Sequence, residues 1–326
     1  MNRRDFVFKS SLSLATASII GNKAFGQFLN PSVAAIPRIG AITYSFRSMD
    51  DSIDSIIGYC KTCGMTAIEL MGEPVEKHLG APKNPIDFRS LFANGRRREL
   101  TEDEKAQSEK YRNDLAAWRS SVSMGDFKKL KKKFSAAGIE IYAFKPSTFG
   151  EQNSDAEIEY GMQAGKALGA NSVTVELPRN PAQSARLGKL AEKNKIYVGY
   201  HAHLQATDSL WDEALAQSPY NSMNLDCGHY IAAGGDNTKE SLLKLIVDRH
   251  DRITSMHLKD RQNKANGGEN LAWGTGDTPI CEILNLLRDK GYDIPVSVEL
   301  EYKIPEGSDA VQEVKKCVDY AKACLA

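Results

Sequence analysis

The regular alternation of short apolar runs with amphipathic segments constrains the fold more than any other feature. Runs rich in β-branched residues predict strands over 39–46, 66–71, 139–144, 171–177, 196–203, 221–229, 253–260 and 295–302. Helical patterns lie between them, and several of these end at a glycine, as at Gly64, Gly169 and Gly291. Eight strand–helix units in about 300 residues predict an α/β protein with a (β/α)8 TIM barrel fold. A doubly wound sheet is the alternative, but no GxGxxG motif follows the first run.

The N-terminal segment 1–26 is interpreted as a twin-arginine signal peptide. Arg3 and Arg4 precede a moderately apolar stretch, and Ala24-Phe25-Gly26 forms a small-x-small cleavage motif. An amphipathic N-terminal helix is the alternative. Because Gln27 and not Cys follows the cleavage motif, we expect no lipid anchor. The signal predicts a periplasmic or otherwise exported protein without a membrane anchor after cleavage.

Residues 37–326 are predicted to form one barrel with a helical insertion at about 73–125, which either covers the barrel mouth or decorates its surface. Lys and Arg together number 42, as do Asp and Glu, so the net charge is zero. This balance gives no electrostatic reason to expect nucleic acid or an anionic membrane as a partner. The six cysteines fit no disulfide scaffold, and the Cys60–Cys63 CxxC spacing falls in a helical pattern, which favours a structural role.

Polar side chains cluster at the ends of most predicted strands, where TIM barrels carry their catalytic groups. This set comprises Glu69, Lys145, Glu176, His201, His203, Asp226, His229, His257, Lys259, Asp260, Glu299 and Glu301. His201 and His203 are two residues apart on one predicted strand, so both rings are expected on the same side. A ring of carboxylates and imidazoles destabilises a barrel unless a cation neutralises it, and the pattern therefore predicts a bound divalent metal.

Six short motifs follow one another in the order of the strands: TYSFR (43–47), IELMGEP (68–74), LDCGH (225–229), MHLKD (256–260), WGTGD (273–277) and VSVELE (296–301). Together they resemble the sugar phosphate isomerase/epimerase family of xylose isomerase-like TIM barrels. The resemblance covers nearly the whole mature chain. It implies one divalent ion, expected to be manganese, with zinc, cobalt or iron as alternatives that suit a mixed nitrogen and oxygen site.

The resemblance also implies roles for individual residues. The implied metal ligands are His201, Asp226, His257 and Glu299. His201 departs from the family, which has a glutamate at this place, so the family's symmetrical pair of metal-bound glutamate bases is lost. The implied catalytic groups are therefore Glu299 on one side, with Glu176 or His203 as its partner. The implied substrate-binding residues are His229, Lys145, Lys259 and Arg261.

Three functions remain open at this point. The first is a metal-dependent isomerase or epimerase that removes a proton next to the carbonyl of a sugar or keto-sugar. The second is an exported lyase or hydratase acting on 3-keto-glycosides, and the third is a non-catalytic sugar-binding barrel. A DNA-repair role, known in the endonuclease IV branch, is disfavoured because the required extra histidines are missing from the second and third strand ends. The expected partner is a small sugar, and the chain is either a monomer or a homo-oligomer.

Overall fold

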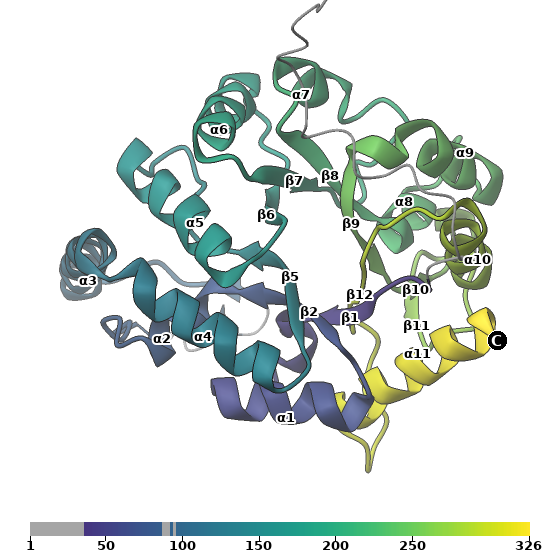
Figure 1. The fold of residues 1–326 in the computed structure, drawn as a ribbon, viewed down its shortest axis with the longest axis horizontal. Helices are drawn as coiled ribbons and strands as arrows, with labels where there is room; N and C mark the ends of the chain where they lie inside the picture. The colour runs from purple at the N-terminus through teal and green to yellow at the C-terminus, as the bar shows by residue number, and fades with distance from the viewer. Residues whose placement is uncertain (1–35, 87–91, 94–95) are drawn as a thin grey trace, which may run out of the picture. The chain divides into compact units, whose positions relative to one another are not determined.

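The computed structural model describes residues 36–86, 92–93 and 96–326, and the predicted signal peptide lies outside this part of the chain. In the described part, eight parallel strands close into a barrel with helices around it (Figure 1), which confirms the predicted fold class. No helix in these ranges is long and apolar enough to cross a bilayer.

All eight strands of the barrel run in the same direction, so their carboxyl ends meet at one rim. Around the ring the order is β1 (Ile39–Ile42), β12 (Val296–Val298), β9 (Ile253–Leu258), β8 (Asn221–Asp226), β7 (Tyr197–His201), β6 (Ser172–Glu176), β5 (Glu140–Lys145) and β2 (Ala67–Met71). Parallel pairing between β2 and β1 closes the ring. This closure gathers groups from distant parts of the chain.

The helices pack their apolar faces against the outside of the barrel. They are α1 (Ile53–Cys63), α4 (Met124–Ala136), α5 (Asp155–Leu168), α6 (Pro181–Asn194), α7 (Asp212–Gln217), α8 (Cys227–Ala233), α9 (Lys239–Arg249), α10 (Ile280–Lys290) and α11 (Ala310–Leu325). Local signals set their ends: the Ser52 hydroxyl accepts a hydrogen bond from the Ser55 amide at the start of α1. The predicted stop Gly64 follows α1 with a φ of 66°, which a glycine adopts without strain.

The interior of the barrel is largely polar, whereas the main apolar core lies between the strands and the helices. Along β2, Ile68 and Leu70 belong to that core, while Glu69 between them is fully buried on the opposite face. Glu69 is hydrogen-bonded to Thr174 of β6 and Ser297 of β12, both also fully buried. Polar side chains from several strands therefore meet beneath the rim.

Several predicted strands end earlier than expected, and local contacts explain two of these ends. The first run leaves the sheet at Thr43 and forms a 3-10 turn over Thr43–Phe46. The run 221–229 stops at Asp226, because the Asp226 carboxylate accepts a hydrogen bond from the His229 amide at 2.6 Å and thereby begins α8. His203, which we expected on a strand, lies just beyond the end of β7.

The helical insertion contains α2 (Gly72–His78) and α3 (Glu102–Ser121), with the short strands β3 (Phe92–Ala93) and β4 (Arg96–Arg97) between them. Arg119 of α3 is buried and donates two hydrogen bonds to the Glu76 carboxylate, at 2.8 and 3.0 Å. Figure 1 shows α3 at the outside of the barrel, where it contacts α5. α3 therefore packs beside the ring of helices that surrounds the barrel.

A disulfide between Cys281 and Cys324 joins α10 to α11, a pairing that the spacing of the cysteines did not predict. The two residues are 43 positions apart and share no motif, so only the packing of the two helices reveals the pair. Cys60 and Cys63 are free and buried in α1, and burial raises the pKa of the Cys60 thiol to about 12. The structural interpretation of the CxxC spacing agrees with these facts.

Candidate metal centre and active site

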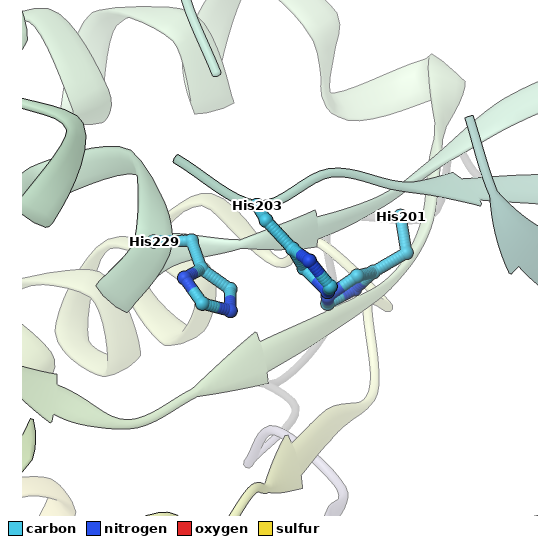
Figure 2. A group of neighbouring side chains, drawn as sticks. All are labelled: His201, His203 and His229. Carbon is cyan, nitrogen blue, oxygen red and sulfur yellow. The ribbon is translucent and has the colours of Figure 1, made fainter. Parts of the chain in front are cut away.

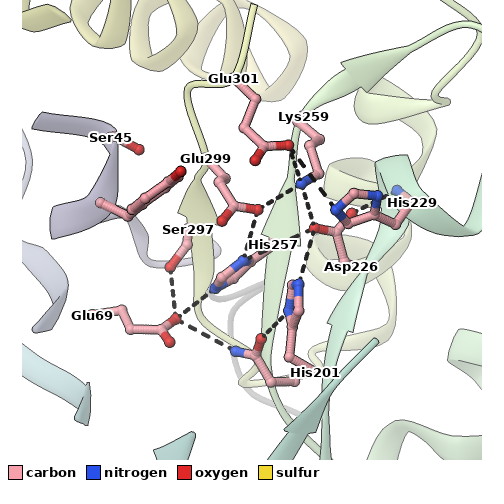
Figure 3. A network of polar contacts seen from close by, with 12 residues as sticks. Ser45, Glu69, His201, Asp226, His229, His257, Lys259, Ser297, Glu299 and Glu301 are labelled. Carbon is pink, nitrogen blue, oxygen red and sulfur yellow. Dashed lines mark hydrogen bonds and ion pairs between the residues drawn. The ribbon is translucent and has the colours of Figure 1, made fainter. Parts of the chain in front are cut away.

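The four predicted metal ligands lie together at the carboxyl rim of neighbouring strands, as Figure 3 shows. His201 ends β7, Asp226 ends β8, His257 lies in β9, and Glu299 directly follows β12. The Asp226 Oδ2 atom is 3.8 Å from His201 Nε2 and 4.0 Å from His257 Nδ1. His257 Nδ1 is in turn 3.1 Å from Glu299 Oε2. All four side chains are buried.

His201 presents an unprotonated nitrogen to this group. Its Nδ1 lies 2.9 Å from the Asn224 side-chain oxygen, which only accepts hydrogen bonds, so Nδ1 carries the proton. The Nε2 lone pair then faces Asp226. Burial and the nearby His257 lower the pKa of His201 to about 4, and the ring is neutral at physiological pH. A neutral imidazole with a free lone pair is a suitable metal ligand.

His257 is held between two carboxylates. Its Nε2 lies 2.8 Å from Glu69 Oε2, and its Nδ1 faces Glu299. Burial opposes the charged form, but Glu69 and Glu299 together raise the pKa of His257 to about 10. Because Nε2 keeps its proton and donates it in a hydrogen bond to Glu69, Nδ1 is the nitrogen that an ion would bind, after displacing the proton there.

Lys259 supplies a further positive charge at the same place. Its Nζ atom is 2.7 Å from Glu299 Oε2, 2.7 Å from Glu301 Oε2 and 3.0 Å from Asp226 Oδ2. Burial opposes the ammonium form, but these carboxylates raise the pKa of Lys259 above its usual value. The ammonium group is therefore charged and fully engaged by its three neighbours.

The donor set fits a divalent ion. Two carboxylates and two imidazoles form the mixed oxygen and nitrogen site that manganese, iron, cobalt and zinc accept. Within the described residues the buried Asp226 Oδ2 atom accepts no hydrogen bond of good geometry, although Lys259 lies close to it. A divalent ion would satisfy this oxygen and take over part of the charge balance that Lys259 and His257 now provide.

His229 lies near the same centre but is suited to a different role. Ligand atoms of His201, Asp226, His229 and Glu299 lie within 4.8 Å of one another, and His201, His203 and His229 form a second such group (Figure 2). However, Arg261 Nη1 donates to His229 Nδ1 at 2.7 Å, which leaves the proton on Nε2. A protonated nitrogen donates a hydrogen bond and does not ligate a metal.

A second polar group lies at the ends of β5, β6 and β7. Glu176 Oε1 is 2.9 Å from Lys145 Nζ, and Glu176 Oε2 is 3.4 Å from His203 Nε2. The His203 side chain is 54% exposed and its ring centroid lies 5.0 Å from that of His201. Partial burial opposes ionisation of Glu176, but His201 and Lys145 lower its pKa. In the ring of eight strands, β6 and β12 are four places apart, so Glu176 and Glu299 start from opposite sides of the rim.

The cations predicted to bind substrate already have partners. Lys145 pairs with Glu176, and Lys259 with three carboxylates. Arg261 is buried and donates to His229 and to the Gly268 carbonyl oxygen. Lys259 and Arg261 are therefore buried beside the ligand cluster and paired with neighbouring residues, and they are not surface charges.

Comparison with known families identifies the architecture. Residues 57–324 match the family described as xylose isomerase-like TIM barrel. The chain belongs to this family. None of the curated proteins compared with the chain matches it.

Solved structures share the fold of this chain at low sequence identity. A sugar phosphate isomerase/epimerase from Parabacteroides distasonis is 17% identical, with 92% of this chain and 99% of that chain covered and a TM-score of 0.56. The apo form of 3-keto-D-glucoside 4-epimerase, YcjR, from E. coli is 14% identical, with 88% and 100% covered and a TM-score of 0.56. The probable 3-DHS dehydratase AsbF from Bacillus anthracis is 15% identical, with 87% and 98% covered and a TM-score of 0.59.

Several residues of this xylose isomerase-like barrel have roles that the sequence did not reveal. The sequence marks Glu69 as a strand-end carboxylate, whereas the structure buries it against His257 inside the barrel. Asn224 stands two residues before Asp226, and this spacing, which puts both on one face of a strand, is the signal that could have revealed it. Asp260 proves to be structural, since its carboxylate accepts hydrogen bonds from the backbone amides of Gly274, Thr275, Gly276 and Thr278.

Proposed function

We propose that this protein is a metal-dependent sugar isomerase or epimerase that moves a proton at the carbon next to a carbonyl group. The observation that carries the proposal is the placement of two acid–base groups on opposite strands of the rim, with the ligand cluster on the strands between them. Glu299 follows β12, and the Glu176–His203 pair lies at β6 and β7. With this placement, Glu299 can act on one face of a bound substrate and the Glu176–His203 pair on the other.

The ion would be held by His201 Nε2, Asp226, His257 Nδ1 and Glu299, with manganese as the proposed metal and zinc, cobalt or iron as alternatives. When bound, it supplies Lewis-acid polarisation of the substrate and stabilises the negative charge that appears as the proton leaves. Glu299 removes or returns the proton on one side, and Glu176 with His203 does so on the other. His229 donates its Nε2 proton in a hydrogen bond to a substrate oxygen.

The substrate is proposed to be an uncharged sugar or keto-sugar. A phosphate or carboxylate group is held best by an arginine or lysine that is free to pair with it. The three cations marked for this role, Lys145, Lys259 and Arg261, are each committed to protein partners. Hydroxyl and carbonyl groups, in contrast, need only donors such as His229 and acceptors such as Glu301.

We also propose that the protein acts outside the cytoplasm. The twin-arginine pattern of segment 1–26 motivates this proposal. The Cys281–Cys324 disulfide supports it, because disulfides persist mainly in oxidising compartments such as the periplasm.

A lyase or hydratase acting on 3-keto-glycosides is the second candidate. The two acid–base groups differ, since Glu299 is buried whereas Glu176 and His203 are about half exposed. Unequal partners suit a one-way elimination or hydration as well as a reversible epimerisation. The names of the similar structures include an epimerase of a keto-glucoside and a probable dehydratase. Epimerisation next to a ketone and elimination of a group β to it both begin with loss of the same proton.

The test is solvent deuterium exchange followed by NMR. The manganese-loaded protein is incubated in D2O with free sugars and with their 3-oxidised glycosides, and the manganese is removed before spectra are recorded. We expect deuterium at one carbon next to the carbonyl, together with the epimer. Deuterium with loss of water or aglycone would assign the lyase, and neither exchange nor turnover across the panel would leave only a sugar-binding barrel and refute the proposal.

A further inference from the structure

We infer that Glu69 is a positioning residue that determines which nitrogen of each imidazole ligand faces the metal: Nδ1 of His257 and Nε2 of His201. The inference rests on the metal site of the proposed function but concerns a residue that is not itself a ligand. Glu69 lies on β2, which is four places from β8 in the ring of strands and three from β9. Its carboxylate therefore reaches across the barrel to the side that carries the ligands (Figure 3).

Four donors surround this fully buried carboxylate. They are Thr174 Oγ1 at 2.7 Å, His257 Nε2 at 2.8 Å, Ser297 Oγ at 3.2 Å and Asn224 Nδ2 at 3.4 Å. An ionised carboxylate only accepts hydrogen bonds. Each neighbour must therefore turn a donor toward Glu69, and the direction of every hydrogen bond around it is fixed.

The first branch of this network is direct. His257 must keep a proton on Nε2, the nitrogen that faces Glu69 at 2.8 Å. Its other nitrogen, Nδ1, is then the one that points to Glu299 and Asp226. A carboxylate behind a metal-bound histidine fixes the tautomer and orientation of the ring in this way.

The second branch passes through Asn224. Its amide nitrogen is directed to Glu69 and to Ser255 Oγ, at 3.4 and 2.7 Å, so its oxygen faces His201 Nδ1. If the amide were reversed, its NH2 group would face His201, the ring proton would move to Nε2, and the lone pair would point away from the site. Ser255 cannot prevent the reversal, because a hydroxyl both donates and accepts. Glu69 is the partner of Asn224 that accepts only.

His201 and Asn224 form a matched pair in this scheme. The resemblance to the family implies a glutamate ligand where this chain has His201. A histidine ligand has a second ring nitrogen that needs a hydrogen-bond partner, whereas a carboxylate has no such nitrogen. Asn224 meets that need from the neighbouring strand β8, two residues before the ligand Asp226. One carboxylate on the far side of the barrel thus sets both nitrogen ligands.

The test uses protein labelled with 15N in its six histidines and loaded with zinc, which gives diamagnetic spectra. Long-range 1H–15N correlation spectra report, ring by ring, which nitrogen carries a proton and which binds metal. The signals missing from metal-free His201→Gln and His257→Gln identify the two rings in the metal-free protein, and a zinc titration of the wild-type protein follows each ring to the loaded state. We expect one ring bound through Nε2 with a proton on Nδ1, and the other bound through Nδ1 with a proton on Nε2.

Glu69→Gln should disturb this pattern. The new amide also donates, so both rings should populate a second tautomer, and zinc affinity should fall by about 10-fold to 100-fold. Thr174→Val is the matched control, since it removes a hydrogen bond to the same carboxylate without touching the Asn224 or His257 branch. It should leave the tautomers and the zinc affinity unchanged. A wild-type-like pattern and affinity in Glu69→Gln would overturn the inference.

A third variant covers the case in which Glu69→Gln does not fold. Asn224→Leu interrupts only the His201 branch, so His201 should lose its fixed tautomer while His257 keeps Nε2–H. Equal disturbance of both rings, or of neither, would contradict the inference. The spectra can be recorded without any turnover. If the expected pattern is found in a protein that transforms no sugar, only the proposed function is refuted. If the protein turns over a sugar but Glu69→Gln has unaltered spectra, only the role of Glu69 is refuted.

Discussion

Three histidines at the rim differ in one respect, the partner of the nitrogen that faces away from the centre. His201 donates to an amide oxygen, His257 to a carboxylate, and His229 accepts from a guanidinium. The partner of His201 leaves a lone pair at the other nitrogen, and the partner of His257 leaves Nδ1 as the nitrogen that an ion would bind once its proton is displaced, whereas the partner of His229 leaves a proton on Nε2. The position of the proton on each imidazole is therefore set by the residue that is hydrogen-bonded to the nitrogen facing away from the centre.

The partner of His229 gives a first prediction. Arg261→Met removes the donor to His229 Nδ1, so the proton is no longer held on Nε2 and the hydrogen bond to substrate weakens. We expect KM to rise about tenfold, equivalent to about 1.4 kcal/mol, with a smaller change in kcat. Steady-state kinetics with the substrate found by deuterium exchange measures both constants. Loss of bound metal from this variant would instead make His229 or Arg261 part of the ligand set.

Glu176 gives a second prediction. Glu176→Gln removes a proposed acid–base group whose side chain is half exposed, so the barrel should stay folded. Turnover should fall by about 10² to 10⁴, the usual contribution of a general acid or base, while metal content stays at the wild-type level. Glu306→Gln, an exposed glutamate beyond β12, is the control. Turnover of Glu176→Gln within twofold of wild type would exclude Glu176 from the reaction.

The sequence predicts which strands carry polar groups at their carboxyl ends, because these residues stand in or directly after each apolar run. It does not predict what lies opposite across the barrel. Glu69 and Ser297 are 228 residues apart in the chain and are hydrogen-bonded in its interior. Asn224 carries the period-two spacing to Asp226, but nothing in the sequence shows that its amide faces His201.

Among the larger elements, α3 carries a buried ion pair between its Arg119 and Glu76 of α2. Arg119→Met leaves the Glu76 carboxylate buried with Tyr160 as its remaining close donor. Breaking one side of a buried pair costs about 3 kcal/mol, so the free energy of unfolding should fall by that amount in urea denaturation. Lys110→Met removes an exposed pair with Asp114 on the same helix and should change stability by less than about 0.5 kcal/mol. Equal effects of the two variants would contradict the proposed anchoring of α3.

The helices α10 and α11 give a further prediction through their disulfide. Cys281→Ser combined with Cys324→Ser opens a loop of about 43 residues, which should lower the free energy of unfolding by about 4 kcal/mol. Reductant should destabilise the wild-type protein by a similar amount and leave the double variant unchanged. If reductant has no effect on the wild-type protein, the disulfide does not form in solution.

The sequence predicted these elements better than their ends. Eight strands and the glycine stops follow from patterns that are local. The early ends of β1 and β8 depend on the turn at Thr43 and the cap formed by Asp226, which a run of β-branched residues does not reveal. The position of α3 and the disulfide are fixed only by packing between distant helices.

For the whole molecule, closure of a parallel barrel has the largest consequence. It brings residues 69, 201, 226, 257 and 299 to one region although they come from five strands or their ends. Without a metal, the cluster is balanced by the charged His257 and Lys259 beside its carboxylates. A bound ion replaces part of this balance and stabilises the folded state, by about 2.7 kcal/mol at a free concentration of one hundred times its Kd.

Metal content measured on the purified, dialysed protein tests the shared cation most directly. Elemental analysis should find one divalent ion per chain in the wild-type protein. Asp226→Ala and His257→Ala should each retain less than a tenth of that amount while their circular dichroism remains that of a folded barrel. Full occupancy in both variants, or no ion in the wild-type protein under metal-replete conditions, would contradict a metal centre at this rim.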